Sequence, residues 1–217
     1  MLSVLSFDLD GTLIKKGLDD VFWQELIPKI YAEKRKIGFD DARRFILEEY
    51  DRIGSDDPRW YIPEYWFERF DLPGSIPEVL GMVQYAEGVY DDVPLLSGLS
   101  KRYRVVISTN NPRIILEHKL KVLKQVEESV SDTFSSVSDF NRMVKSTEFY
   151  TAVCERMGIR PEQMLHVGDD PRHDLAIPKS LGVKALLIDR ERKITGEDVI
   201  HSLAELERIL QAGTARL

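Results

Sequence analysis

The chain has 217 residues, of which 43% are hydrophobic, so it is long enough for one large domain or for a domain with a substantial insertion. Its formal charge of −7 argues against a nucleic-acid backbone as the principal partner. A single cysteine, Cys154, excludes an internal disulfide framework, and no stretch has the length of apolar sequence that a membrane span requires, so we expect a cytoplasmic protein.

Short apolar strands alternate with helices along most of the chain. Residues 3–7 predict a first strand, and further strands are predicted near 103–109, 133–136, 163–168 and 183–189. Helices are predicted over 110–125, with Asn111 as its N-cap, over 146–157, around 174–182 and at the C-terminus. Strands that alternate with helices indicate a parallel sheet with right-handed crossovers. We therefore expect an α/β fold with a Rossmann-like parallel-sheet core.

The segment 17–87 differs from the rest in composition. It holds 16 Asp and Glu against nine Lys and Arg, together with 13 of the 20 aromatic residues. Its pattern is helical over 19–36, 40–54, 63–70 and 76–88, and Asp residues at the start of the first two helices are expected as N-caps. We predict a catalytic core of residues 1–16 and 88–217, with an α-helical cap domain, 17–87, inserted after the first strand.

Polar side chains stand where the predicted strands end. Asp8 follows the first strand, Thr109 ends the strand at 103–109, and Asp169 follows the strand at 163–168. Lys145 lies just before a helix, between the last two of these strands. Ligands of open parallel sheets bind beyond the carboxyl ends of the strands. These groups are therefore expected to share one rim, which is able to hold a divalent cation and a phosphate.

Each of these groups has a chemical use on such a rim. Asp8 and Asp10 point to the same side of extended backbone, so one can attack phosphorus while the other protonates the leaving oxygen and then activates water. Mg²⁺ held by Asp8, Asp169 and a backbone carbonyl, with Asp10 as a further candidate ligand, would offset the negative charge of the carboxylates, as would Lys145. The remaining candidates, which would hold the phosphoryl oxygens, are Gly11, Thr109 and Asn110.

With these residues in place, the chain resembles the haloacid dehalogenase superfamily, in particular its phosphatase-like members with a helical cap. The resemblance rests on "DLDGT" at 8–12, "ISTN" at 107–110, Lys145 and "HVGDDPRHD" at 166–174, in that order. It implies Asp8 as nucleophile, Asp10 as acid and base, Thr109 and Lys145 as phosphate holders, and Asp169 as a metal ligand. Asp174 matches a second acidic position, as a metal ligand or as a residue that orients the metal's water or Lys145.

Several details of the site stay open at this stage. Ser108 competes with Thr109 for the hydroxyl role, although Thr109 is favoured because Asn110 follows it. Asp170 is either an extra ligand or a solvated neighbour. His166, in an apolar strand, is expected to be a hydrogen-bonded residue of the core. Arg59 and Trp60 are the candidates for reading the leaving group.

The function predicted is a Mg²⁺-dependent phosphatase that acts on a small phosphorylated metabolite through an aspartyl-phosphate. The alternatives are a phosphosugar mutase, a 2-haloacid dehalogenase of the same superfamily and, from another class, a signalling receiver phosphorylated on an Asp after its third strand, for which Asp139 is the candidate. We expect a small phosphorylated substrate as the partner, without nucleic acid or membrane. The sequence favours neither a monomer nor a dimer.

Overall fold

The computed structural model describes residues 1–213, apart from the side chain of Gln125, and within them six parallel strands form one sheet. In spatial order the strands are β3 (Asp132–Ser135), β2 (Arg104–Thr109), β1 (Val4–Phe7), β4 (Met164–Gly168), β5 (Lys184–Ile188) and β6 (Val199–Ile200). In the centre, Val4 of β1 is paired with Arg104 of β2 and with Met164 of β4. The chain order reverses beside β1, which is where open α/β sheets bind ligands. The predicted α/β fold is confirmed.

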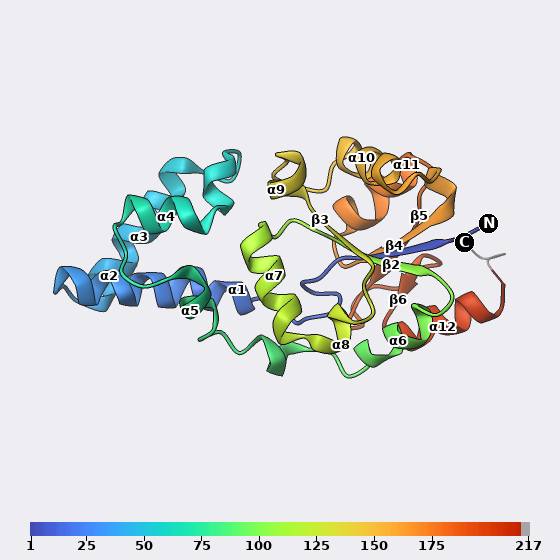
Figure 1. Cartoon of the computed structure of the whole chain (residues 1–217), viewed down its shortest axis with the longest axis horizontal. Coiled ribbons are helices and arrows are strands. Elements are labelled where there is room, and N and C mark those ends of the chain that lie inside the picture. The colour runs from blue at the N-terminus through green and yellow to red at the C-terminus, as the bar shows by residue number, and fades with distance from the viewer. Residues whose placement is uncertain (214–217) are drawn as a thin grey trace.

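Helices cover both faces of this sheet (Figure 1). Side chains alternate along a strand, so Leu5 and Phe7 of β1 join one apolar cluster while Val4 joins another on the opposite face. The helices of this part are α6 (Leu96–Leu99), α7 (Arg113–Val122), α8 (Lys124–Glu127), α9 (Ser136–Phe140), α10 (Thr147–Met157), α11 (Ile177–Ser180) and α12 (Leu203–Gln211). None of the helices in residues 1–213 has the length and apolarity to cross a membrane.

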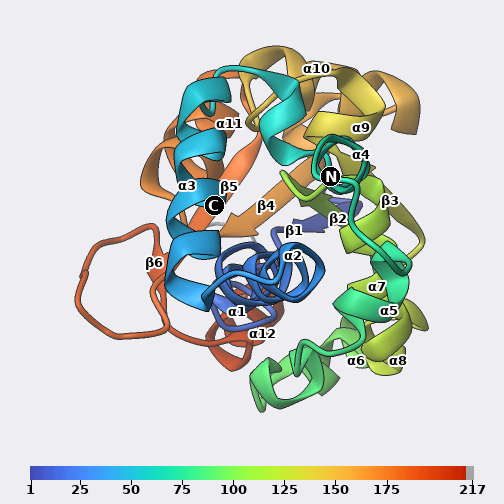
Figure 2. The same ribbon diagram turned by 90° about the vertical axis from the view of Figure 1, so that its left-hand side faces the viewer.

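Residues 17–87, which we call the helical insertion, lie beyond the carboxyl end of β1 and extend away from the sheet (Figure 1). Seen from that end, they lie in front of the sheet (Figure 2). The insertion contains α1 (Leu18–Asp20), α2 (Ile27–Arg35), α3 (Phe39–Ile53), α4 (Pro63–Arg69) and α5 (Ile76–Leu80). Its apolar cluster is rich in aromatic rings, with Trp66 at its centre, and includes Ile115 of α7. The large rings give this small helical unit a core of its own and join it to α7.

Several helix ends differ from those predicted. Gly17 and Gly38, not Asp residues, occupy the N-cap positions of α1 and α3. The paired Asp residues fall in the first turn, where carboxylates interact favourably with the positive end of the helix dipole. Asn111 is not the cap of α7, because Pro112 takes that position and the Asn111 side chain bonds elsewhere. The helix expected over 76–88 stops at Leu80, and a 3₁₀ turn (Tyr85–Gly88) follows.

Two π-helical stretches, Val21–Leu26 and Pro171–Ala176, each precede a proline. Pro28 and Pro178 lack an N–H, and each ring crowds the carbonyl four residues before it. The helix adapts by widening, so that the N–H of Ile27 donates to Phe22 and the N–H of Ile177 donates to Arg172, five residues back. The second stretch follows Asp170 directly and shapes the loop after β4.

Candidate active site

Lys145 forms ion pairs with two carboxylates near the carboxyl end of β1, those of Asp8 and Asp174. Its Nζ lies 2.7 Å from Oδ1 of Asp8 and 2.6 Å from Oδ1 of Asp174, and only 2% of the lysine is exposed. Asp174 is fully buried, and its Oδ1 is also 2.9 Å from Nε2 of His166, while its Oδ2 accepts from the N–H of Asp170. Lys145 was expected to lie on the rim, and the structure places it between the predicted nucleophile and the predicted second acidic residue.

The charges of this group follow from burial and from the number of partners. Burial raises the pKa of Asp8 to about 7, although Lys145 acts in the opposite direction. Burial also opposes ionisation of Asp174, but Lys145 and His166 outweigh it and hold the pKa of Asp174 below its ordinary range. The two carboxylates outweigh the effect of burial on Lys145, whose pKa is raised. The ammonium is therefore firmly charged, and Asp174 holds its negative charge more readily than Asp8.

His166, on β4, holds the Asp174 carboxylate through its Nε2. It is fully buried, its Nδ1 lies 2.9 Å from Oγ of Ser6, and burial lowers its pKa. It is the hydrogen-bonded core residue that the sequence predicted. Ser6 in turn donates to Oγ of Ser108 over 2.9 Å. Ser108 is thus occupied on the His166 side of the sheet, whereas Thr109 lines the cavity that contains Asp8.

The carboxylates of Asp8, Asp169 and Asp174 form a cluster in which one oxygen of each lies within 4.8 Å of the others. Three carboxylate oxygens are the donor set that a hard divalent cation prefers, so these residues fit Mg²⁺. The Asp10 carboxylate, also predicted as a ligand, instead faces Lys119. Burial raises the pKa of Asp169 against the influence of Lys16, whose ammonium pairs with it.

Gly11 lets the backbone after β1 pass close to this cluster. Its φ of 79° lies in the left-handed region, and a Cβ at this position would come within 2.2 Å of Oδ2 of Asp169. Glycine is therefore required both by backbone conformation and by the close approach of the carboxylate.

Asp10 has an unexpected partner, Lys119 of α7. The Nζ of Lys119 is 2.7 and 2.8 Å from the two oxygens of Asp10 and 2.8 Å from Oδ2 of Asp19, and the lysine is fully buried. Asn111 donates through Nδ2 to Asp10 and to Oγ1 of Thr109. The sequence did contain a signal for Lys119, because it falls on the apolar face of the helix with Ile115, Leu116, Leu120 and Leu123.

A cavity of about 290 Å³ opens between the sheet rim and the helical insertion. From the core it is lined by Asp8, Asp10, Thr109, Asn110, Asn111, Pro112 and Ile115, and from the insertion by Asp19, Asp20, Trp23, Trp60 and Tyr61. The predicted groups of the first two strands therefore face one space. The opposite wall carries three aromatic rings, of which the sequence had named only that of Trp60.

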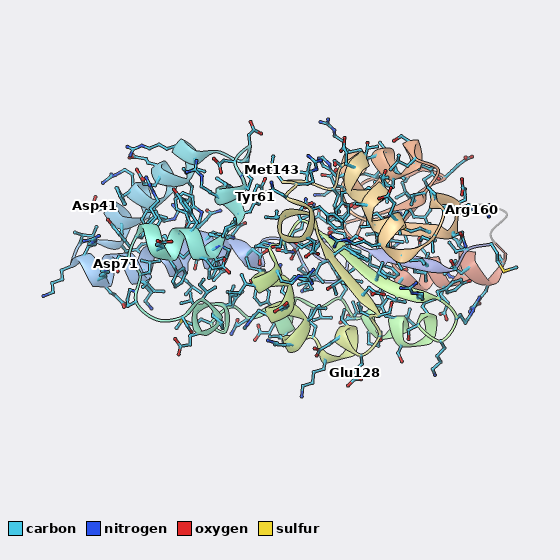
Figure 3. All side chains as sticks on the ribbon, turned by 45° about the horizontal axis from the view of Figure 1, so that its top comes forward. Asp41, Tyr61, Asp71, Glu128, Met143 and Arg160 are labelled. Carbon is cyan, nitrogen blue, oxygen red and sulfur yellow. The ribbon has the colours of Figure 1, made fainter. Side chains whose placement is uncertain are left out.

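The aromatic run at 59–67 divides between two environments. Trp66 and Phe67 are buried in the apolar cluster of the insertion, whereas Trp60 is 36% exposed and lines the cavity. Tyr61 lies at the edge of the insertion that is nearest the core (Figure 3). Arg59 forms an ion pair with Asp57 at 2.6 Å and is not among the lining residues. Of the two candidates for reading the leaving group, Trp60 thus lies at the cavity.

The remaining acidic candidates have local structural partners. Asp170 is the N-cap of the stretch Pro171–Ala176 and accepts from the N–H groups of Arg172 and His173. Asp139, the candidate phosphate acceptor of a signalling receiver, lies on α9, where it pairs with Arg113 and accepts from the N–H of Ser135. Neither side chain is in the carboxylate cluster or lines the cavity.

Comparison with known proteins gives three consistent results. The model of the haloacid dehalogenase-like hydrolase family matches residues 2–182. The GMP/IMP nucleotidase YrfG of Escherichia coli (strain K12) is 25% identical over 168 residues, which cover 75% of this chain and 72% of that protein. The structure of a haloacid dehalogenase (HAD) phosphatase from Thermococcus onnurineus has a TM-score of 0.75 and 26% identity, and the match covers 100% of both chains.

A fourth similarity concerns the fold alone. The 2-haloacid dehalogenase from Pseudomonas syringae pv. Tomato DC3000 has a TM-score of 0.69 at 18% identity, with 98% of this chain and 99% of that chain covered. Hydrolases of two chemistries thus share this architecture, and the choice between them depends on the side chains of the site.

Proposed function

Because the chain belongs to the haloacid dehalogenase-like hydrolase family, and is therefore a hydrolase, we propose that it is a phosphatase acting on a small phosphorylated metabolite. The observation that carries this proposal is the pair of carboxylates after β1 in two distinct environments. Both line the cavity, but Asp8 lies at Lys145 in the carboxylate cluster, whereas Asp10 lies outside that cluster, with Lys119 and Asn111. Two carboxylates in unlike environments suit two roles, nucleophile and acid–base group.

In this proposal the Asp8 carboxylate attacks phosphorus as the ester P–O bond breaks, which leaves an aspartyl-phosphate on the chain. Asp10 gives its proton to the departing oxygen and then takes a proton from the water that hydrolyses the aspartyl-phosphate. Lys145, Thr109 and Asn110 hold the phosphoryl oxygens, with the backbone near Gly11 close by. The second step restores free Asp8 and releases inorganic phosphate.

Mg²⁺ is the proposed cofactor, held by Asp8 and Asp169, with Asp174 behind them. When bound, the cation would neutralise negative charge shared by the carboxylates and the phosphoryl group. Asp174 already contacts Lys145, His166 and the N–H of Asp170. Its proposed part is therefore to fix the direction of Lys145 and the shape of the loop after β4.

The helical insertion is proposed to be a cap domain, with the boundaries 17 and 87, that covers the reacting groups and reads the leaving group. Trp23, Trp60 and Tyr61 on the wall opposite Asp8 support a leaving group with a planar ring, because such a ring can stack on aromatic side chains. The similarity to a nucleotidase makes purine nucleoside monophosphates the first compounds to test.

The first experiment measures hydrolysis of 4-nitrophenyl phosphate with Mg²⁺, with EDTA, and by Asp8→Asn. We expect activity that needs both the metal and Asp8. The matched control is Asp132→Asn, which changes an exposed carboxylate at the start of β3, outside the cavity, and is expected to stay active. Metal-independent release of chloride from 2-chloropropionate, without phosphatase activity, would refute the proposal in favour of a dehalogenase.

A second experiment addresses the leaving group. Trp60→Ala is expected to raise KM for a purine nucleoside monophosphate by about 3- to 10-fold, the loss of one aromatic contact, while KM for glycerol 2-phosphate changes little. Phe45→Ala, at an exposed ring of the insertion that does not line the cavity, is the control. An equal effect of Trp60→Ala on both substrates would count against ring recognition. If a sugar phosphate is isomerised and no inorganic phosphate is released, the enzyme is instead a mutase.

A further inference from the structure

Lys119 uses all of its hydrogen-bonding capacity on oxygens at the edge of the site. Its ammonium has three N–H bonds, and four oxygens lie within reach: both of Asp10, Oδ2 of Asp19 and, at 3.3 Å, Oδ1 of Asn111. Asn111 bonds the same Asp10 through its Nδ2. The orientation of the Asp10 carboxylate is thus fixed by two residues that flank it.

This arrangement is not what packing alone would select. Position 119 lies on the face of α7 that otherwise carries Ile115, Leu116 and Leu120, all buried, so an apolar side chain would fill it without desolvating a charge. A buried ammonium between carboxylates is on average no more stabilising than a well-packed apolar group. Stability alone therefore does not explain a lysine at this position. Its partners indicate that it has a functional role.

The second partner, Asp19, connects Lys119 to the points where the chain enters and leaves the helical insertion. Asp19 lies in α1, two residues after Gly17, and its Oδ1 accepts from the hydroxyl of Tyr85 over 2.7 Å. Tyr85 belongs to the last turn of the insertion, and the Lys119 Nζ is 5.2 Å from the centre of its ring. The first helix and the last turn of the insertion, which we call its two linkers, thus both contact the ammonium that holds Asp10.

We infer that Lys119 is a positioning residue, which holds Asp10 in line for proton transfer and ties its orientation to the two linkers of the insertion. The inference rests on the proposed function, because it takes Asp10 as the group that protonates the leaving oxygen. It assigns Lys119 no contact with the substrate. Its consequence is selective: loss of Lys119 harms those steps that need a proton from Asp10 more than those that do not.

Leaving groups of different basicity separate these steps. An alkoxide needs a proton to leave, whereas 4-nitrophenolate leaves without one. In Lys119→Met, kcat for glycerol 2-phosphate is expected to fall about 100-fold, while the first-turnover release of 4-nitrophenol, followed by rapid mixing, falls less than about 5-fold. Lys121→Met, which changes an exposed lysine on the same helix, is the control and is expected to alter neither rate.

Two further variants extend the test. Lys119→Gln, which keeps a donor and a similar length, provides the same comparison if Lys119→Met does not fold, and it is expected to show the same preference in smaller degree. Tyr85→Phe removes the hydroxyl that reaches Asp19 and leaves the ring in place. It is expected to lower the glycerol 2-phosphate rate by several-fold more than the 4-nitrophenol rate. An unchanged ratio in Tyr85→Phe would overturn the link to the insertion.

The outcomes separate this inference from the function on which it rests. A wild-type protein that turns over neither ester overturns the proposed function and, with it, the role of Lys119. An active wild-type protein together with equal losses on both esters in a folded Lys119 variant overturns the positioning role alone. If a folded Lys119 variant turns over both esters at the wild-type rates, the positioning role is also overturned.

Discussion

The burial of Asp8, the proposed nucleophile, lowers the stability of the metal-free fold, and this cost can be measured. Its carboxyl is buried, and burial raises its pKa from 3.8 to about 7 despite Lys145 at 2.7 Å. The ionised form is therefore less stable in the folded chain than in the unfolded one. Asp8→Asn replaces it with a neutral group of the same shape, so we expect the variant to be inactive and, without metal, more stable than the wild type.

The magnitude follows from the pKa. A pKa raised from 3.8 to about 7 corresponds to about 4 kcal/mol of unfolding free energy above neutral pH. Below pH 3.8 the carboxyl is protonated in both states and costs nothing. Between pH 3.8 and 7 the folded chain binds a proton that the unfolded chain does not, so stability falls as pH rises. The Asn amide of the variant interacts less favourably with Lys145 than a carboxylate does. We therefore expect Asp8→Asn to raise the free energy of unfolding by about 2 to 4 kcal/mol at pH 8.

Thermal unfolding in EDTA, followed by circular dichroism at pH 8 and pH 4.5, tests this expectation. For a chain of this size the gain corresponds to a rise in Tm of roughly 5 to 15 °C at pH 8, and the difference from wild type should shrink at pH 4.5. Asp132→Asn, at an exposed carboxylate, is the control. A lower Tm for Asp8→Asn at pH 8, or a difference that does not depend on pH, would refute the reasoning.

Three other predictions concern single side chains. Lys145→Met leaves two buried carboxylates without their cation, so unfolding in urea should show a loss of about 3 to 5 kcal/mol, and kcat should fall at least about 100-fold. Trp66→Ala opens a cavity in the insertion and should cost about 3 to 5 kcal/mol, observed as a lower urea midpoint; a change below 1 kcal/mol would contradict the packing described. Gly11→Ala forces Asp169 away and should raise the Mg²⁺ concentration for half-maximal activity by about 10-fold, whereas an unchanged metal titration would argue against Asp169 as a ligand.

The sequence was most informative where local pattern and topology agree. The apolar run before Asp8 predicted a buried strand, and alternation of strands with helices predicted the parallel sheet, so the convergence of Asp8, Thr109 and Asp169 at one end followed from geometry. The two-residue strand β6 was missed because it is too short to show a period. The π-helical stretches were missed because they depend on how a helix adapts to a proline two residues into the following helix.

The sequence pattern named Trp60 as a candidate and marked Lys119 as unusual, but it did not show what surrounds either side chain. A lysine on an apolar helix face is ordinarily an exception in the periodicity, and its partner carboxylates, Asp10 and Asp19, are distant in sequence. Trp60 and Trp66 have similar neighbours along the chain, yet one lines the cavity and the other is the centre of the insertion's core. Such distinctions are made by tertiary packing, which a single sequence encodes only indirectly.

The central place of β1 also has a consequence for how the protein is made. Of the six described strands, β1 is synthesised before the others, but its partners β2 and β4 begin at Arg104 and Met164, so β1 stays unpaired while the whole helical insertion is synthesised. The insertion, whose contacts are mostly local, can form early, and by bringing Lys15 and Gly88 together it closes the loop that β1 and β2 need to meet. The segment that we propose as a cap over the site would then also bring β1 and β2 together while the sheet is assembled.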